Sequence, residues 1–242
     1  IKNNKLNRFL YQKVVHQVLV NSPATGNSLN ANNADLVDKR KIKLIPNGID
    51  SGEFFEEPSN IIYKRLADEF VLCNLGRLVQ QKNQTFLIDL AVELKKRRFN
   101  FKLIIGGSGP LESELKQKAA ALGVADSIVF LGFIDRPKDV YFSGDIFVLP
   151  SLWEGFGYVL AEAGLCSIPS VAFNSSSNSQ IIQDGKTGIL VPEQNHVLFA
   201  DAVIKLSEND KMREEMGEAA KSFVMKNFEA DQIFKKIEDA IM

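Results

Sequence analysis

The chain has 242 residues, 45% of them apolar and 24% charged, so it can bury a full globular core and is neither disordered nor fibrous in composition. Its 29 lysines and arginines balance 30 acidic residues, and the net charge of -1 excludes the basic field that non-specific nucleic-acid binding requires. Cys73 and Cys166 lie far apart among apolar residues, which indicates neither a disulfide framework nor a metal site of paired thiolates.

The first part of the chain differs from the rest. Residues 16–20 predict a strand, a polar stretch runs through residue 41, and residues 42–45 form a second apolar run before the turn Pro46-Asn47-Gly48. We interpret residues 1–40 as the trailing segment of a preceding domain and residues 41–242 as a domain of their own. Because the chain starts without Met and without a flexible leader, we expect a fragment of something longer.

No apolar run approaches the roughly 20 residues of a membrane span, and the first residues lack the apolar core of a signal peptide. We therefore expect a cytoplasmic protein, and we expect both cysteines to be buried as small apolar side chains.

From residue 70 onward, short apolar runs alternate with longer amphipathic ones, the pattern of strands and helices wound into a parallel sheet. The candidate strands cover residues 70–75, 101–105, 127–131, 146–149, 170–173 and 188–191. The candidate helices cover residues 85–97, 111–122, 210–223 and 230–241, and the Ser/Asn cluster at 174–179 predicts a loop. The expected fold class is therefore α/β, a Rossmann-like doubly wound parallel sheet.

The loops that follow the strands are the candidate site, because ligands bind an open parallel sheet at the carboxyl ends of its strands. After the first strand, Gly76 opens a turn that carries Arg77 and Lys82 just before a helix, and both cations suit a diphosphate. Solvated or salt-bridged surface cations would give the same pattern. After the second strand, the glycines at residues 106–109 let the backbone approach a ligand closely, although many tight turns share this feature.

The third loop has the most informative pattern, Glu154-Gly155-Phe156-Gly157, and it leads into a helix that contains Glu162. A helix beginning near Gly157 points unpaired N–H groups and its positive dipole end at the edge of the sheet, where a phosphate can be held. Helical side chains tilt toward the N-terminus, so both carboxylates can reach one cleft. The alternative is that Glu154 is a charge of the capping region and Glu162 a solvated helix residue.

Taken in this order, the residues resemble the C-terminal domain of the retaining GT-B glycosyltransferases of the group 1, or family 4, class. The resemblance covers roughly residues 42–240. It rests on Ile45-Pro46-Asn47-Gly48-Ile49-Asp50, Gly76-Arg77-Leu78 with Lys82, Gly107-Ser108-Gly109-Pro110, Phe130-Leu131-Gly132-Phe133, and Glu154 and Glu162 with seven residues between them. It implies the C-terminal half of a GT-B fold, with residues 1–40 belonging to an N-terminal acceptor domain that is mostly missing.

The resemblance also implies a donor substrate, a UDP- or GDP-linked sugar, with no further cofactor and no metal. Arg77 and Lys82 would contact the donor diphosphate and Glu154 the hydroxyls of the transferred sugar, which makes these three the candidate catalytic residues. The other donor-binding residues would be Gly107, Phe133 and Ile134 near the base, Glu162 at the ribose, and the N–H groups of Gly157, Tyr158 and Val159 at the phosphate. Phe156 is also expected among the donor-binding residues.

The partners that the resemblance implies are the donor and a glycan or lipid-linked acceptor, reached through the missing domain, with no nucleic acid. Transfer would retain the anomeric configuration, and this fragment alone would be nearly inactive. Peripheral association of the full-length enzyme with the inner face of the membrane is compatible with such an acceptor.

Two segments depart from the family pattern. Ser175-Ser176 and Gln180 stand where two glycines and an acidic residue are common, and Ser167 stands where a glycine is usual. Two alternatives stay open, a nucleotide-sugar 2-epimerase of the same fold and a non-catalytic nucleotide-binding domain. A dinucleotide fold would want the pattern Gly-x-Gly-x-x-Gly, and residues 107–109 lack its third glycine.

Overall fold

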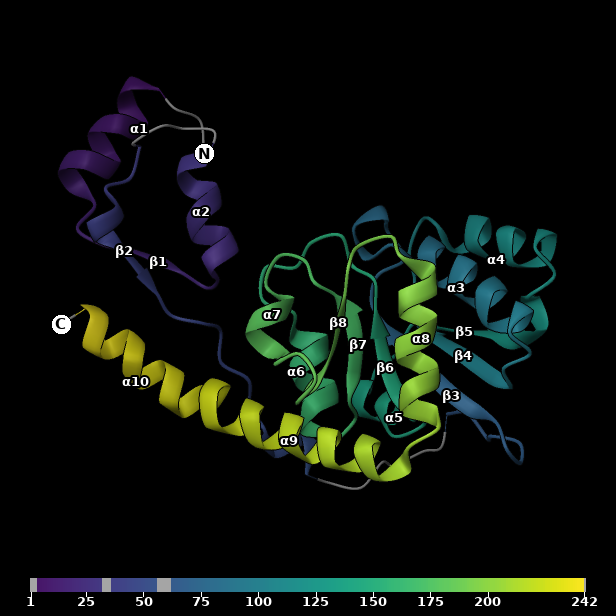
Figure 1. The fold of residues 1–242 in the computed structure, drawn as a ribbon. Coiled ribbons are helices and arrows are strands. Elements are labelled where there is room, and N and C mark those ends of the chain that lie inside the picture. Colours follow the sequence, from purple (N-terminus) through teal and green to yellow (C-terminus); the bar gives the residue numbers. More distant parts are fainter. Residues whose placement is uncertain (1–3, 32–35, 56–61, 242) are drawn as a thin grey trace. The chain divides into compact units, whose positions relative to one another are not determined.

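The computed structural model describes residues 4–31, 36–55 and 62–241 (Figure 1). The chain divides into two compact units. The first unit contains residues 1–50 together with residues 227–242, and the second contains residues 51–226. That residues 1–40 derive from an acceptor domain stays a prediction.

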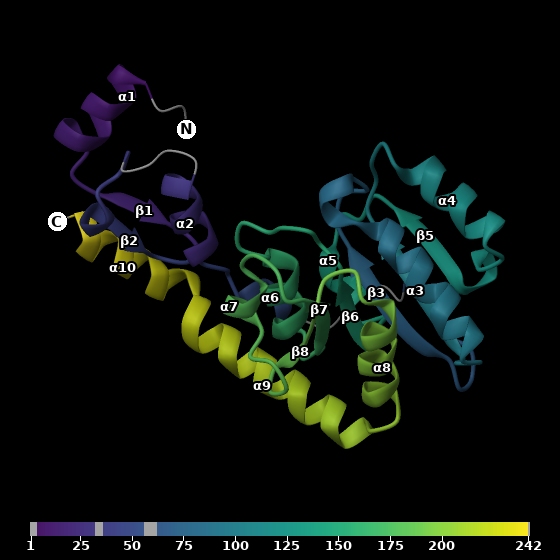
Figure 2. The same ribbon diagram turned by 45° about the horizontal axis from the view of Figure 1, so that its top comes forward.

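The second unit is built on one sheet of six parallel strands in the order β5-β4-β3-β6-β7-β8. Figure 1 labels these strands, and Figure 2 shows β5, β3, β6, β7 and β8 from a second side. The strands are β3 Phe70–Leu75, β4 Phe101–Gly106, β5 Ile128–Gly132, β6 Ile146–Leu149, β7 Ser170–Phe173 and β8 Gly188–Val191. All six predicted strands are confirmed. Counted from β3, the order is the 3-2-1-4-5-6 of the Rossmann fold, which confirms the predicted fold class.

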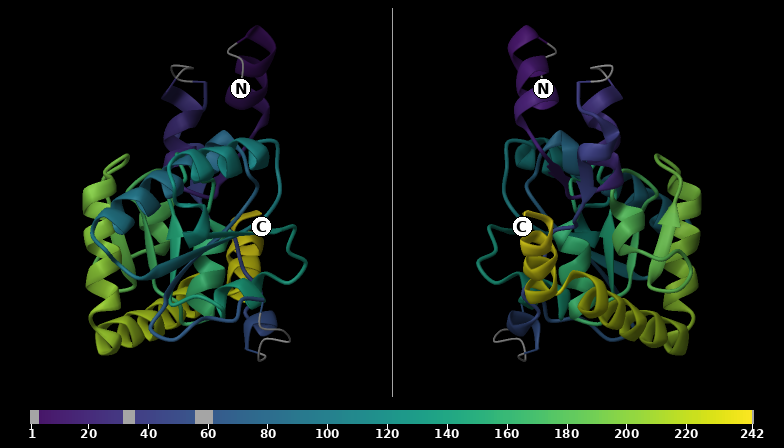
Figure 3. Two further views of the ribbon diagram at one scale, coloured as in Figure 1. Left: turned by 90° about the vertical axis from the view of Figure 1, so that its right-hand side faces the viewer. Right: turned by 90° about the vertical axis from the view of Figure 1, so that its left-hand side faces the viewer.

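Helices connect these strands or follow the last of them, and they can be followed from two sides in Figure 3. They are α3 Gln84–Lys96, α4 Glu112–Ala121, α5 Pro137–Tyr141, α6 Tyr158–Leu165, α7 Asn178–Ile181, α8 His196–Ser207 and α9 Asp210–Phe228. The predicted loop at 174–179 is wrong at its end, where α7 begins. There the Asn178 side chain is buried and its amide donates to the Phe173 carbonyl at 2.9 Å, so a polar residue starts a helical turn inside the fold.

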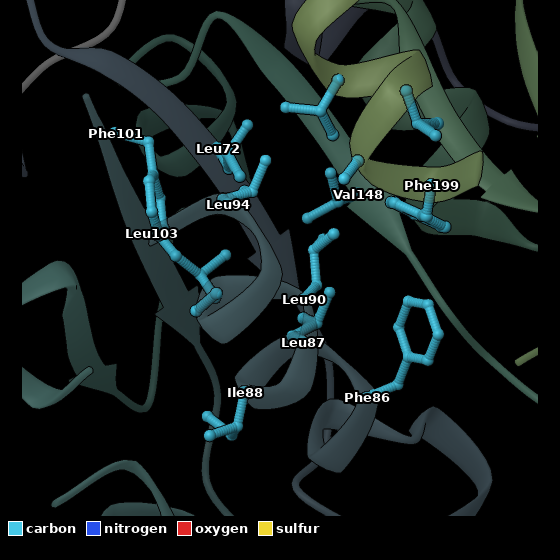
Figure 4. Packing of buried hydrophobic residues seen from close by; sticks show 14 of the residues in the cluster. Leu72, Phe86, Leu87, Ile88, Leu90, Leu94, Phe101, Leu103, Val148 and Phe199 are labelled. Atoms are coloured by element: carbon cyan, nitrogen blue, oxygen red, sulfur yellow. The ribbon is translucent and has the colours of Figure 1, made fainter. Parts of the chain in front are cut away.

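The two faces of the sheet are covered by different helices, as strand alternation requires. Leu72, Leu103 and Val148 share one buried cluster with α3, α4 and α8. Figure 4 shows Leu87, Leu90 and Leu94 of α3 packed beside them. Residues that alternate with these along the strands face the other side, where Tyr141 of α5 packs edge-on against Phe147 with ring centroids 5.4 Å apart. Both cysteines are buried, as predicted.

The order of the strands reverses between β3 and β6. From β3 the chain moves outward to β4 and β5, and it then returns to place β6 on the other side of β3. The crevice at such a reversal is where open parallel sheets bind ligands, so the loops after β3 and β6 are the expected centre of the site.

The first unit contains a short helical segment and a two-stranded parallel sheet. Its elements are α1 Lys5–Phe9 with the π-helix Leu10–Val14, β1 Val18–Val20, α2 Pro23–Ala31, β2 Ile42–Leu44 and α10 Ala230–Ile241. The predicted strand at 16–20 begins only at Val18, because the N–H of Val15 closes the π-helix on the Leu10 carbonyl and leaves His16 in the connection.

Helix α10 belongs to the first unit although it is last in the chain. Reciprocal backbone hydrogen bonds join Ile49 to Phe228 and Ala230 at 2.8 and 3.1 Å, and Gly48 packs against Ala230. Within residues 4–31, 36–55 and 62–241, no helix combines the length and apolar character needed to cross a bilayer.

Candidate donor-binding site

Loops at the carboxyl edge of the sheet are hydrogen-bonded to their neighbours from β5 to β7. The loops after β3 and β4 are joined where the N–H groups of Gly76 and Leu78 donate to the carbonyls of Gly106 and Ser108 at 3.0 and 3.1 Å. The N–H of Gly107 donates to the Gly132 carbonyl at the end of β5, at 2.7 Å. Gly107 has a φ of +125°, and a Cβ there would lie 2.0 Å from the Gly76 carbonyl oxygen. Only glycine fits where these strand ends approach so closely.

The loops after β3 and β6 meet at the reversal point. The Leu152 N–H donates to the Gln81 carbonyl at 2.9 Å, and the Gln81 side-chain amide donates to the Trp153 carbonyl at 2.9 Å. The Asn83 amide reaches the Pro150 carbonyl at 3.2 Å. These contacts fix the position of the residue between them, Lys82, relative to the start of α6.

Lys82 and Glu154 form an ion pair across the two loops. The Lys82 Nζ lies 2.6 Å from the Glu154 Oε1, and the side chains are only 18% and 8% exposed. Removing one member of such a pair leaves an uncompensated, poorly solvated charge. The structure thus places the predicted cation, Lys82, in contact with the predicted carboxylate, Glu154, although the two are far apart in the sequence.

The second carboxylate lies beside this pair. Burial raises the pKa of Glu162 above its ordinary value, while the hydrogen bond from Tyr141 and the charge of Lys82 lower it. The Tyr141 hydroxyl donates to the Glu162 Oε2 at 2.6 Å. Burial and the neighbouring carboxylate raise the pKa of Tyr141 well above its ordinary value, so its hydroxyl keeps the proton that it donates. Lys82 thus acts electrostatically on both glutamates.

Helix α6 begins at the predicted position. Gly157 is its N-cap, with left-handed backbone at φ 89°, and no side chain caps the helix. The N–H groups of Tyr158 and Val159 have no acceptor among the residues that the structure describes. Phe156 is buried and packs edge-on against the half-exposed Tyr158, with ring centroids 5.0 Å apart. The N-terminus of α6 is therefore open to an anion.

A pocket of about 440 Å³ lies over the ends of β3, β4 and β5, within the size range of small-ligand sites. It is lined by Leu75, Gly76, Arg77, Gly107, Ser108, Gly109, Phe133 and Ile134. Phe133 is largely exposed. The Arg77 side chain is exposed and, in the described part of the chain, makes no ion pair. The pocket is thus lined both by the residues predicted near the base and by Arg77, which was predicted at the diphosphate.

The roles predicted for the site residues stay predictions, but their placement is clear. Arg77, Gly107, Phe133 and Ile134 share the pocket. Lys82, Glu154 and Glu162 form a charged group next to the N-terminus of α6, where the remaining four predicted residues lie.

Sequence reasoning missed Tyr141 and Ser176, which contact Glu162 and Glu154. Their partners are 21 and 22 residues away in the sequence, so no local pattern signals the contacts. The only sequence signal was the Ser175-Ser176 departure. No group of three or more His, Cys, Asp or Glu that could hold a metal ion occurs among the described residues.

Comparison with known proteins identifies the family. Residues 58–223 match the family described as Glycosyl transferases group 1, and because this match covers more than half of the chain, the chain belongs to that family. The predicted resemblance is thereby confirmed at the level of the family, and the epimerase alternative gains no support.

Two curated relatives illustrate the match. A protein named uncharacterized glycosyltransferase MJ1607, from Methanocaldococcus jannaschii, is 34% identical over 207 residues. The match covers 81% of this chain and 52% of the length of that relative. A GDP-mannose-dependent alpha-(1-6)-phosphatidylinositol monomannoside mannosyltransferase from Mycolicibacterium smegmatis is 31% identical over 201 residues. The match covers 78% of this chain and 53% of the relative. The chain spans about half the length of the curated relatives it matches.

Among solved structures, Anabaena Alr3699/HepE in complex with UDP and glucose superposes with a TM-score of 0.83 at 22% identity, covering 97% of this chain and 66% of that chain. This likeness concerns the fold, and it supports the predicted C-terminal half of a GT-B architecture.

Proposed function

We propose that this chain carries the donor-binding part of a group 1 glycosyltransferase of the retaining, family 4 class. The donor is a UDP- or GDP-linked sugar, and the full-length enzyme transfers the sugar to a glycan or lipid-linked acceptor. The observation that carries the proposal is the largely buried Lys82–Glu154 ion pair beside Glu162, at the reversal point of the sheet.

The diphosphate of the donor needs positive charge on several sides. Arg77 offers a planar fork at the rim of the pocket, and the open N-terminus of α6 offers the N–H groups of Tyr158 and Val159. Lys82 supplies a third positive group. Together these groups stabilise the charge that develops on the leaving diphosphate, so the proposal assigns no step to a metal ion or cofactor.

The other parts of the donor fit the neighbouring groups. The base occupies the pocket between Gly107, Phe133 and Ile134, and the ribose hydroxyls donate to Glu162. Glu154 accepts hydrogen bonds from the hydroxyls of the transferred sugar. A structural neighbour solved with UDP and glucose and a relative named as GDP-mannose-dependent support a nucleotide-sugar donor here.

The acceptor belongs to the rest of the enzyme. The names of two relatives, a phosphatidylinositol monomannoside mannosyltransferase and a capsular polysaccharide biosynthesis glycosyltransferase, support a lipid-linked or polysaccharide acceptor. The proposal places the full-length enzyme in the cytoplasm, at the inner face of the membrane where the acceptor is lipid-linked. It also holds that this chain alone transfers little sugar.

Calorimetric titration tests the donor site directly. UDP, GDP, UDP-glucose and GDP-mannose are titrated into the chain, and we expect saturable binding of one diphosphate and its sugar conjugate. Arg77→Ala should weaken that binding about tenfold or more, because a charged hydrogen bond to phosphate contributes roughly 1.5–3 kcal/mol.

The matched control is Arg98→Ala, which removes an exposed arginine just after α3, at the opposite edge of the sheet. Equal losses in both variants would contradict the diphosphate contact. If neither this chain nor the full-length protein bound any of the four ligands, the donor-binding function itself would be wrong.

A further inference from the structure

The loop after β7 holds the Glu154 backbone through serine hydroxyls. The Ser176 Oγ accepts a hydrogen bond from the Glu154 N–H at 3.2 Å and donates to the Glu154 carbonyl at 2.6 Å. The Ser177 Oγ donates to the same carbonyl at 3.0 Å. Both polar atoms of the Glu154 backbone are therefore bonded to side chains of one neighbouring loop.

The chemistry of Ser176 assigns these bonds uniquely. Its hydroxyl has one proton, and the Glu154 N–H can only donate, so the hydroxyl accepts there and uses its proton on the carbonyl. A hydroxyl that both accepts and donates to one residue restricts rotation of that residue's backbone. Ser177 is fully buried and adds a second bond to the carbonyl.

Ser176 makes these bonds from an unfavourable backbone conformation. Its φ is 51°, in the left-handed region, where a residue with a Cβ is disfavoured by roughly 1–2 kcal/mol. Glycine would adopt this conformation without that strain. The hydroxyl is what serine contributes at this position, and both of its hydrogen bonds go to Glu154.

We propose that Ser176 is a positioning residue for Glu154. By fixing the Glu154 backbone, it keeps the carboxylate at the Lys82 ammonium, in the place where the hydroxyls of the transferred sugar arrive. This assignment rests on the proposed function, because it takes Glu154 to contact the sugar. It follows that Ser176 affects recognition of the sugar more strongly than recognition of the nucleotide, which also depends on Arg77, the N-terminus of α6 and the base pocket.

Two substitutions separate positioning from simple stability. Ser176→Gly removes the hydroxyl and the strain, whereas Ser176→Ala removes the hydroxyl and keeps the strain. Ser176→Gly should therefore unfold at a higher temperature than Ser176→Ala. Ser179→Ala is the control, because Ser179 is exposed on α7 and its side chain makes no hydrogen bond among the described residues.

Calorimetry then compares UDP with UDP-glucose and GDP with GDP-mannose in the wild-type chain and in the three variants. The quantity of interest is the affinity for the nucleotide sugar divided by the affinity for the free nucleotide. We expect this ratio to fall about three- to tenfold in Ser176→Gly and Ser176→Ala alike, the effect of losing a hydrogen bond of ordinary strength. Affinity for the free nucleotide should stay within about twofold, and Ser179→Ala should match the wild type.

The outcomes separate the two proposals. If the wild type bound a nucleotide and the ratio did not change in either variant, Ser176 would have no positioning role while the donor site stood. The positioning role of Ser176 would also be wrong if its variants lost affinity for the free nucleotide and for the nucleotide sugar together, along with thermal stability. It would equally be wrong if the wild type bound the nucleotide sugar no more tightly than the free nucleotide. Absence of all binding would overturn the proposed function and this assignment with it.

Discussion

The charges at the site are arranged so that one cation serves two carboxylates. Lys82 pairs with Glu154 at 2.6 Å. Burial raises the pKa of Glu162, and the hydrogen bond from the Tyr141 hydroxyl and the charge of Lys82 offset only part of that rise. The positive charge of Lys82 is therefore already paired with the Glu154 carboxylate. A diphosphate needs additional positive groups, which the exposed Arg77 and the open end of α6 supply.

The raised pKa of Glu162 predicts a pH dependence of stability. The pKa of Glu162 is higher in the folded chain than in the unfolded chain, so the folded chain holds this proton up to a higher pH. The contribution of the protonated carboxyl to the free energy of unfolding is therefore present at low pH and is lost as the pH rises through the folded pKa. Glu162→Gln imitates the protonated form. The variant should therefore gain free energy of unfolding relative to the wild type as the pH is raised from about 4, near the ordinary pKa of a glutamate, to 7.

Urea unfolding of the wild type and the variant at a series of pH values measures this difference. Glu218→Gln, on the exposed part of α9, controls for the substitution itself. A difference between wild type and Glu162→Gln that did not change with pH, or that favoured the wild type more at pH 7, would contradict the burial effect.

At the scale of single residues, the sequence predicted the charged groups but not what positions them. Lys82, Glu154 and Glu162 stand in local patterns of glycines and helix starts, which a strand-loop-helix interpretation places at one edge of the sheet. Tyr141 and Ser176 carry no such pattern, because their contacts exist only after separate loops and helices have packed together.

At the scale of the elements, Gly107, the glycine just after β4, determines how closely the strand ends approach. A Cβ on Gly107 would lie 2.0 Å from the carbonyl oxygen of Gly76, a backbone atom that the sheet holds in place. The pocket is lined by both of these residues, so its shape depends on this approach.

Gly107→Ala should therefore open the pocket and destabilise the second unit. Gly123→Ala is the matched control, since Gly123 also has a positive φ, of +68°, but a Cβ there meets nothing within 4 Å. The control should lose only about 1 kcal/mol, the cost of a left-handed backbone with a Cβ, whereas Gly107→Ala should lose clearly more and bind the nucleotide less tightly. Thermal unfolding and nucleotide titration check both, and equal losses in the two variants would show that the close approach does not matter.

The strands of the main sheet were predictable, even the short ones, and the shortest helices were not. The six strands follow from buried apolar runs, and the period of Leu87, Leu90 and Leu94 identified α3. Helices α5 and α7 have 5 and 4 residues, too short to show a helical period, and α7 lies in a polar segment that the sequence presents as a loop.

At the scale of the whole chain, the first unit combines the two ends of the sequence. Gly48 packs so closely on α10 that a Cβ would lie 2.9 Å from the Ala230 Cα and 3.3 Å from the Ile233 Cβ. Ile233 is one of the buried residues of this unit. The turn at residues 46–48, predicted from its sequence, thus affects stability through its packing on α10, which begins 182 residues after Gly48, at Ala230.

Gly48→Ala should loosen the first unit while nucleotide affinity in the second unit stays unchanged. Gly26→Ala is the control within the same unit, because its nearest neighbour would be at an ordinary 3.4 Å. Amide hydrogen exchange should rise in α10 and in residues 42–50 of Gly48→Ala alone. Unchanged exchange in α10 would contradict the close packing, and a fall in nucleotide affinity would show that the two units are energetically coupled.

The hydrogen-bonded row of loops from β5 to β7 has a thermodynamic consequence. The loops after β3, β4, β6 and β7 are fixed by hydrogen bonds to one another. The conformational entropy of these loops is therefore mostly lost when the chain folds. A ligand that binds there does not have to order them again. The heat of binding at this edge should then report mainly the contacts made with the ligand and the water displaced, with little contribution from loop ordering.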